Sequence, residues 1–246
     1  MKGIERKNIL GVPVDLIDME GAIRHINDLI AGNSRNNYIF AINAEKVMAL
    51  QKDSFLRQMA ENASLLIPDG IGAVLALKLL YGKRAKRVPG VDLMHNICRE
   101  AAEKGYKIFI YGAKEEINKK SVEKLHELYD GIKIVGRSHG YVTSDKMDYL
   151  LRQINESGAD ILFIALGSPK QEKWIQEYLP KLNVKVCQGI GGTLDTIVGI
   201  VKRAPESFQR LGLEWFYRLL KEPKRIRRQL VLPLFILKVL REKMRR

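Results

Sequence analysis

The chain of 246 residues carries a net charge of +14 and a hydrophobic fraction of 46%, enough for one large α/β domain or for a domain with an appendage. Its two cysteines, Cys98 and Cys187, lie far apart without metal-type spacing, which argues against a disulfide framework and suits a reducing compartment. The N-terminus lacks a signal-peptide pattern, and no apolar run reaches the roughly 18 residues expected of a membrane-spanning helix.

Strand-like apolar runs alternate with helix-like stretches along the chain. We expect strands at 9–14, 37–42, 64–67, 107–111, 132–135, 160–166 and 184–188. We expect helices at 19–32, 44–61 with a break near Asp53, 70–81, 91–104, 114–129, 145–157, 169–179 and 207–221, and a last helix led by Pro223. This alternation predicts a Rossmann-like α/β fold, with a mainly parallel sheet covered by helices on both faces.

Ligands of such sheets bind beyond the carboxyl ends of the strands, so the residues that follow each strand are candidate site residues. Asp69 follows the strand at 64–67 within a Pro-Asp-Gly turn. Aspartate before glycine is ordinary turn chemistry, or it caps the next helix. A carboxylate at the end of a strand can equally act as a general base. Both interpretations of Asp69 stay open on local grounds.

Two further turns carry polar or glycine-rich sequences. In the 167–171 turn, Lys170 opposes the helix macrodipole unless an anion lies nearby, which favours ligand contact for Lys170 and Gln171. The 189–192 turn holds glycine at 189, 191 and 192, which suits either a phosphate approached by backbone N–H groups or a tight strand-to-helix turn. It does not complete G-x-G-x-x-G, and no H-E-x-x-H, C-x-x-C or D-x-D occurs, so we predict neither cofactor nor metal.

The C-terminal part of the chain holds most of the charge. Residues 201–246 contain 14 lysines and arginines against 4 glutamates, a net charge of +10 that leaves +4 for the first 200 residues. Such a basic segment suits nucleic acid, phosphates or an anionic membrane surface. Its apolar residues cluster together, which suits either a basic helix pair docked on the body or an amphipathic helical appendage lying on lipid. We expect the appendage on lipid.

Several motifs in one order resemble the WecG/TagA/CpsF glycosyltransferases of bacterial surface-polymer synthesis, over nearly the whole chain. They are Asn43-Ala44-Glu45, Pro68-Asp69-Gly70, Arg87-Val88-Pro89-Gly90-Val91-Asp92, Gly167-Ser168-Pro169-Lys170-Gln171-Glu172, Gly191-Gly192 with Asp195, Lys202-Arg203-Ala204-Pro205, and Gly212-Leu213-Glu214-Trp215 running to Glu222-Pro223 and Arg228. One departure is Ala41, where teichoic acid members can carry threonine.

The resemblance implies an inverting, metal-independent transfer of N-acetylmannosamine from its UDP sugar to undecaprenyl-diphosphate-linked N-acetylglucosamine, the committing step of wall teichoic acid synthesis. It implies that Asp69 is the general base. It implies substrate binding by Asn43, Arg87, Gln171, Gly191, Gly192, Asp195, Arg218, Arg225 and Arg228. We therefore expect a catalytic domain at 1–201, and an appendage at 202–246 that holds a cytoplasmic protein to the inner face of the membrane and favours homo-oligomers.

Three alternatives remain to be weighed. A related transferase would use another UDP sugar, such as UDP-N-acetylmannosaminuronate. A nucleotide-binding oxidoreductase would need the G-x-G-x-x-G fingerprint that this chain lacks. A nucleic-acid-binding protein would interleave aromatic with basic residues. In residues 201–246 the aromatic residues cluster with aliphatic ones instead, so we predict no nucleic-acid partner.

Overall fold

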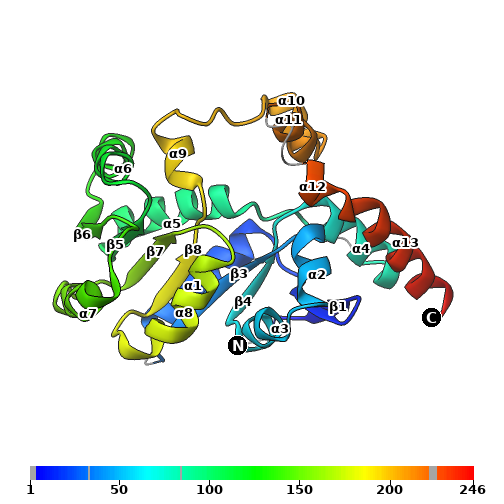
Figure 1. Ribbon diagram of the computed structural model, residues 1–246, viewed down its shortest axis with the longest axis horizontal. Helices are drawn as coiled ribbons and strands as arrows, with labels where there is room; N and C mark the ends of the chain where they lie inside the picture. Colours follow the sequence, from blue (N-terminus) through cyan, green and yellow to red (C-terminus); the bar gives the residue numbers. More distant parts are fainter. Residues whose placement is uncertain (1–3, 33, 84, 222–225) are drawn as a thin grey trace.

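The computed structural model describes residues 4–32, 34–83, 85–221 and 226–246 (Figure 1). Within them, six parallel strands form one sheet in the order β4-β3-β8-β7-β5-β6. The strands are β3 (Asn37–Ile42), β4 (Leu65–Pro68), β5 (Lys107–Gly112), β6 (Lys133–Ser138), β7 (Ile161–Ala165) and β8 (Val186–Gly189). The predicted parallel α/β fold is thus confirmed.

The expected strand at 9–14 is wrong, because this segment folds as a separate antiparallel hairpin of β1 (Arg6–Ile9) and β2 (Val12–Asp15). Leu10 and Gly11 form its turn, with φ angles of 52° and 79°. Two consecutive residues at positive φ match the twist of a two-residue hairpin. The apolar run therefore contains a turn that hydrophobicity alone does not reveal.

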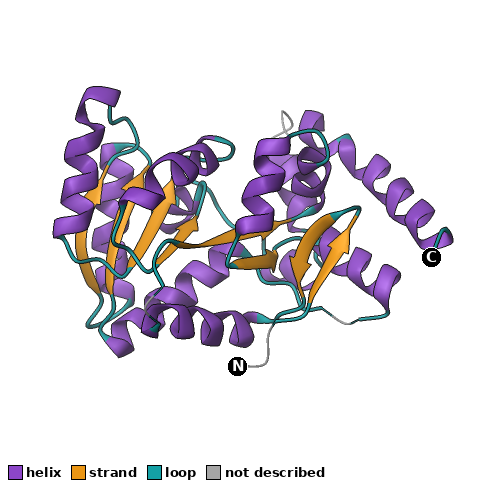
Figure 2. Cartoon of the chain, turned by 90° about the horizontal axis from the view of Figure 1, so that it is seen from below, coloured by secondary structure: helices purple, strands orange, loops and turns teal. Residues whose placement is uncertain are grey.

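Helices pack on both faces of the sheet, as Figure 2 shows in purple around the orange strands. They are α1 (Met19–Ala31), α2 (Ala44–Leu50), α3 (Ser54–Asn62), α4 (Ile71–Tyr81), α5 (Gly90–Lys104), α6 (Glu115–Leu128), α7 (Met147–Glu156), α8 (Lys170–Tyr178), α9 (Thr193–Ile197), α10 (Glu206–Arg210), α11 (Glu214–Lys221), α12 (Ile226–Gln229) and α13 (Val231–Met244). One core cluster joins the sheet to α1, α5, α6 and α9, and the other joins it to α2, α3, α4, α7 and α8.

The helices agree with the sequence prediction at Asp53 and differ from it at two places after residue 192. The break near Asp53 is confirmed, since the Asp53 carboxylate accepts the Leu56 N–H and begins α3. The expected helix at 207–221 is two helices, because Gly212 adopts a φ of 71° between α10 and α11. The short α9 was not expected. Pro223, which we expect to lead the last helix, lies outside the described residues.

The C-terminal helix packs on the body of the molecule. In Figure 1 α13 runs beside α4, and it contacts both α2 and α4. Phe235 and Val239 are buried and belong to the same core cluster as residues of those helices. One side of α13 therefore completes the core, while Leu234, Ile236 and Leu240 on its other sides are exposed. None of the described helices is both long enough and apolar enough to cross a membrane.

Candidate functional site

The predicted site residues gather where four neighbouring strands end. Asn43 follows β3 and Asp69 follows β4, directly beyond the paired residues Ile42 and Pro68. Gln171 lies in α8 after β7, and Gly191 follows β8. Because β4, β3, β8 and β7 are consecutive in the sheet, these residues share its carboxyl edge. This is the edge at which open α/β sheets bind ligands.

Asp69 is held in place by backbone groups from two elements. Its own N–H donates to the Ile42 carbonyl over 3.0 Å, which continues the pairing of β3 with β4. Its carboxylate oxygen Oδ1 accepts the Gly90 N–H at 2.7 Å. Gly90 is the first residue of α5, so the carboxylate meets the positive end of a 15-residue helix. Asp69 is half-buried, and its orientation is fixed by more than its own turn.

Gln188, in the central strand β8, braces the same start of α5. Its Nε2 donates to the Gly90 carbonyl at 3.0 Å, so Gly90 is held by Gln188 on one side and by Asp69 on the other. Gln188 is a polar residue, yet it is only 2% exposed and lies among apolar strand residues. Gln188 was not among the predicted site residues. A glutamine inside an apolar strand next to the glycine-rich turn is the signal that could have identified it.

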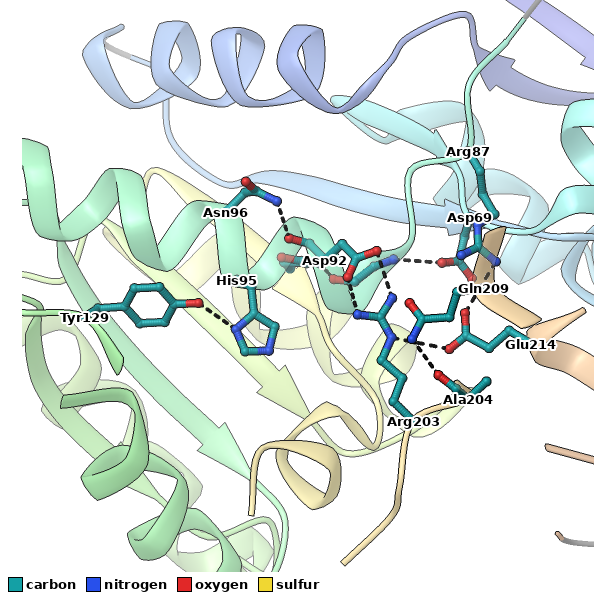
Figure 3. A network of polar contacts seen from close by, with 12 residues as sticks. Asp69, Arg87, Asp92, His95, Asn96, Tyr129, Arg203, Ala204, Gln209 and Glu214 are labelled. Atoms are coloured by element: carbon teal, nitrogen blue, oxygen red, sulfur yellow. Dashed lines mark hydrogen bonds and ion pairs between the residues drawn. The ribbon is translucent and has the colours of Figure 1, made fainter. Parts of the chain in front are cut away.

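Charged residues from the C-terminal segment, which is residues 202–246, reach the start of α5 (Figure 3). Arg203 binds both carboxylate oxygens of Asp92, with Nη2 2.8 Å from Oδ2. Its Nε lies 3.6 Å from Oε1 of Glu214, which is 9% exposed. Arg87 reaches the other oxygen of Glu214 at 3.4 Å. We call Arg87, Asp92, Arg203 and Glu214 the charge cluster.

The charge cluster joins one predicted site residue, Arg87, to three residues for which no role was predicted. Arg87 was expected to bind substrate, and it lies beside Asp69 in Figure 3, where it contacts Glu214. Asp92, Arg203 and Glu214 each stand in a motif of the family resemblance but were given no role. The hydrogen bonds that Arg203 donates to the Asp92 carboxylate raise the pKa of Arg203, so its charge is permanent. Their pairing across more than a hundred residues carries no local sequence signal.

Gln171 bridges the ends of β7 and β8. Its Oε1 accepts the Gly191 N–H at 3.1 Å. Its side chain lies over Gly189, where an added Cβ would come within 2.6 Å of Nε2. Glycine at 189 therefore makes room for Gln171. The N–H of Gly191, which the sequence suggested for a phosphate, is here the partner of Gln171.

Asn43 and Lys46 hold the first turn of α2. Asn43 caps this helix through Oδ1, which accepts the Lys46 N–H at 2.9 Å. The Lys46 ammonium donates to Ser168 and to the buried carboxylate of Glu172, both at 2.7 Å. The ends of β3 and β7 are thereby joined by a nearly buried ion pair, whose side chains are 14% and 4% exposed. The sequence analysis assigned no role to Lys46 or Glu172.

The remaining predicted residues have simpler surroundings. Gly192 is the N-cap of α9, and Asp195 lies inside that helix, where its carbonyl accepts the N–H groups of Ile200 and Val201. Arg225 lies outside the described residues. Arg218 and Arg228 lie in α11 and α12, but their side chains are also outside what the structure describes.

His95, Cys98 and Cys187 have pKa values that are shifted by burial. His95 Nδ1 lies 2.7 Å from the Tyr129 hydroxyl, and burial lowers the pKa of His95, which favours the neutral ring. Burial raises the pKa of Cys98 to about 12 and raises that of Cys187 as well, so both stay protonated thiols. No group of three or more histidine, cysteine or carboxylate residues that could hold a metal occurs within the described ranges.

Two comparisons with known proteins match most of the chain. The glycosyl transferase WecG/TagA/CpsF family matches residues 7–246. The chain is also 38% identical, over 204 residues, to N-acetylglucosaminyldiphosphoundecaprenol N-acetyl-beta-D-mannosaminyltransferase from Bacillus subtilis (strain 168). That alignment covers 83% of this chain and 79% of the relative. Both matches include the sheet edge with Asp69 and Gln171, and the family match extends through α13.

Proposed function

Because the chain belongs to the WecG/TagA/CpsF family of glycosyltransferases, we propose that it transfers N-acetylmannosamine from UDP-N-acetylmannosamine to undecaprenyl-diphosphate-linked N-acetylglucosamine. This is the committing step of wall teichoic acid synthesis. The observation that carries the proposal is the relative of that name, which matches most of both chains. The relative favours N-acetylmannosamine over its uronate as the donor sugar, and it disfavours the oxidoreductase and nucleic-acid alternatives.

The proposed reaction is a single displacement at the anomeric carbon of the donor sugar. The acceptor hydroxyl, the 4-OH of N-acetylglucosamine, attacks this carbon while Asp69 takes the hydroxyl proton. The bond from the anomeric carbon to the UDP oxygen breaks, and the sugar inverts. The position of Asp69 at the carboxyl edge, with Oδ1 fixed by the Gly90 N–H, supports its role as the base. A general base typically contributes about 10²–10⁴-fold in rate.

Departure of UDP concentrates negative charge that the protein has to stabilise. Fixed N–H groups and guanidinium groups do this most effectively in a water-poor site. We assign the charge stabilisation to Arg87 and to the tail arginines Arg218, Arg225 and Arg228, and the sugar contacts to Asn43, Gln171, Gly191, Gly192 and Asp195. The convergence of Asn43, Asp69, Gln171 and Gly191 on one sheet edge supports this assignment.

The acceptor is a lipid, and the C-terminal helices suit a lipid surface. Exposed apolar side chains occur along α12 and α13, including Ile226, Leu230, Ile236 and Leu240. An open groove of about 390 Å³ beside them is lined by Leu10, Gln51, Lys238, Arg241, Glu242 and Arg245. Each lysine or arginine near an anionic surface contributes about 1 kcal/mol to attachment. We propose peripheral attachment to the inner face of the cell membrane, and self-association through the same apolar residues when lipid is absent.

A donor panel tests the reaction. UDP-N-acetylmannosamine, its uronate, UDP-glucose and UDP-N-acetylglucosamine are each incubated with a lipid-diphosphate-linked N-acetylglucosamine acceptor, and the glycolipid products are identified by mass spectrometry. We expect turnover with UDP-N-acetylmannosamine. Preference for the uronate would indicate that the protein acts in a related step of surface-polysaccharide synthesis. Absence of glycosyl transfer from every donor would contradict the proposed activity.

Sedimentation with vesicles tests the membrane proposal. We expect the chain to sediment with vesicles rich in phosphatidylglycerol, and Ile236→Ser/Leu240→Ser to stay in the supernatant. Leu128→Ser on α6 is the control, because Leu128 is equally exposed on another helix. Point variants are preferable to removing residues 202–246, since Phe235 and Val239 fill the core. Unchanged sedimentation of the double variant would contradict attachment through α13, and analytical ultracentrifugation without vesicles reports self-association.

A further inference from the structure

Arg203 stands at the centre of the charge cluster, where it contacts Asp92 and Glu214. Its bidentate partner Asp92 lies in the first turn of α5, two residues after Gly90. A fork-to-fork pair of guanidinium and carboxylate is both stronger and more directional than a single hydrogen bond. Arg203 therefore fixes the start of α5 from the side of the C-terminal segment.

The start of α5 in turn fixes Asp69. Its first N–H, that of Gly90, donates to Asp69 Oδ1 at 2.7 Å, while Gln188 holds the Gly90 carbonyl from the sheet. Val88, just before the helix, donates to the Pro68 carbonyl at 2.9 Å. Since a helical turn moves as a unit, a shift of Asp92 also shifts the N–H that orients the carboxylate.

The C-terminal segment contacts the Asp69 turn at a second place. An added Cβ at Gly212 would come within 2.9 Å of Ile71, the first residue of α4 and only two positions after Asp69. Glu214 follows at the start of α11, where it joins Arg203 to Arg87. Residues 203–214 thus lie against both helices that begin beside Asp69.

We propose that Arg203 is a positioning residue for the general base: by holding Asp92 it fixes the Gly90 N–H that orients the Asp69 carboxylate. The C-terminal segment then has two roles: it attaches the protein to lipid, and through Arg203 it affects the rate of the chemical step. The inference rests on the proposed role of Asp69, because the effect of the Arg203–Asp92 pair on the chemical step passes through that carboxylate. A 1 Å error in the position of a reacting group lowers rates about 10²-fold, so a loosened base slows turnover without weakening donor binding.

The test compares Arg203→Met and Asp92→Asn with the unchanged chain, using kcat and KM for the donor. We expect each variant to lose about 10-fold or more in kcat while KM for the donor changes little. The double variant is expected to lose no more than either single variant, because the two residues act as a pair. Arg137→Met is the control, since Arg137 forms a half-exposed ion pair with Glu115 at the far end of the sheet.

An Asp69→Asn background separates positioning from other roles. If Arg203 acts through Asp69, Arg203→Met causes no further loss of kcat there. A full additional loss would show a direct or purely structural role and would overturn the proposal, as would wild-type kcat in both single variants or an effect on KM alone. Should Arg203→Met fail to fold, the isosteric Asp92→Asn decides the question by the same criteria. Slow Asp69→Asn with normal Arg203→Met would reject the positioning role while leaving the proposed base intact.

Discussion

The two sides of the sheet edge are built differently. On the side of α2 and α8, Lys46 pairs with Glu172, and Gln171 accepts the Gly191 N–H, so these polar contacts join residues of the α/β body. Apolar residues of α13 also pack against α2. On the side of α5, Asp69 accepts the Gly90 N–H, and the start of α5 is held by Arg203 from the C-terminal segment. We call the first the preformed side, because its polar contacts lie within the body, and the second the completed side, because Arg203 lies 111 residues after Asp92.

This difference separates stability from catalysis. A buried ion pair that loses one partner leaves an uncompensated charge, so damage to the preformed side destabilises the fold. Within the charge cluster, the Arg203–Asp92 pair is partly exposed to solvent, where a single ion pair contributes little to stability. Damage to the completed side should therefore appear mainly in turnover.

The largest expected effect is on the stability of the preformed side. Lys46→Met leaves the Glu172 carboxylate buried without its cation, and we expect the free energy of unfolding to fall by about 3 kcal/mol or more. Urea denaturation followed by circular dichroism measures the loss. Lys46→Met/Glu172→Leu should recover most of it, because no charge then remains buried. A stable single variant would show that both sides tolerate loss of their ion pairs, which would break the comparison.

Asp69→Asn should have the next largest effect, on catalysis alone. The amide keeps the shape of the carboxylate but cannot take a proton, so kcat is expected to fall by about 10²-fold or more. UDP binding, measured by calorimetry, should persist. Asp53→Asn is the matched control, because that aspartate also accepts a backbone N–H at a helix start and asparagine caps equally well. Wild-type turnover of Asp69→Asn would reduce Asp69 to a turn residue.

A smaller effect is expected at Gln171. Gln171→Ala removes the acceptor of the Gly191 N–H. We expect kcat/KM to fall about 10-fold, because one hydrogen bond between uncharged groups is lost. Gly189→Ala should reproduce this loss with little change in stability, since the added methyl group displaces only the flexible Gln171 side chain. The exposed Gln153 of α7 offers the control Gln153→Ala. Full activity of Gly189→Ala would show that the position of Gln171 is not critical.

The smallest expected effect is that of metal removal. The sequence lacks D-x-D, and the proposed mechanism assigns the charge of departing UDP to arginines and N–H groups from both sides of the edge. Activity measured after dialysis against excess EDTA should equal that of the untreated protein. Inactivation by EDTA with rescue by Mg²⁺ or Mn²⁺ would show that a cation is needed to bridge the two sides.

The α/β body of this protein can be predicted from its sequence. Strands such as 107–111 and 160–166 are buried on both faces, so they read as continuous apolar runs, and alternation with helices predicts a parallel sheet. Once the strands are known, Asp69 and the 167–171 turn fall at one edge by geometry alone. The Asp53 helix start was also predictable, because a cap and its helix are neighbours in the sequence.

Tertiary structure decided what depends on partners distant in the chain. The pair of Asp92 with Arg203 spans 111 residues, and the motif that holds Arg203 does not show which carboxylate it meets. Gln188 is recognisable as a polar residue in an apolar strand, but its partner Gly90 is known only once α5 packs against it. The two backbone turns at Leu10–Gly11 and Gly212 divide a predicted strand and a predicted helix. The periodicity of apolar residues predicts which face of a helix or strand is turned toward the core. It does not predict which distant residue a side chain contacts, because that contact forms only when separate elements pack together.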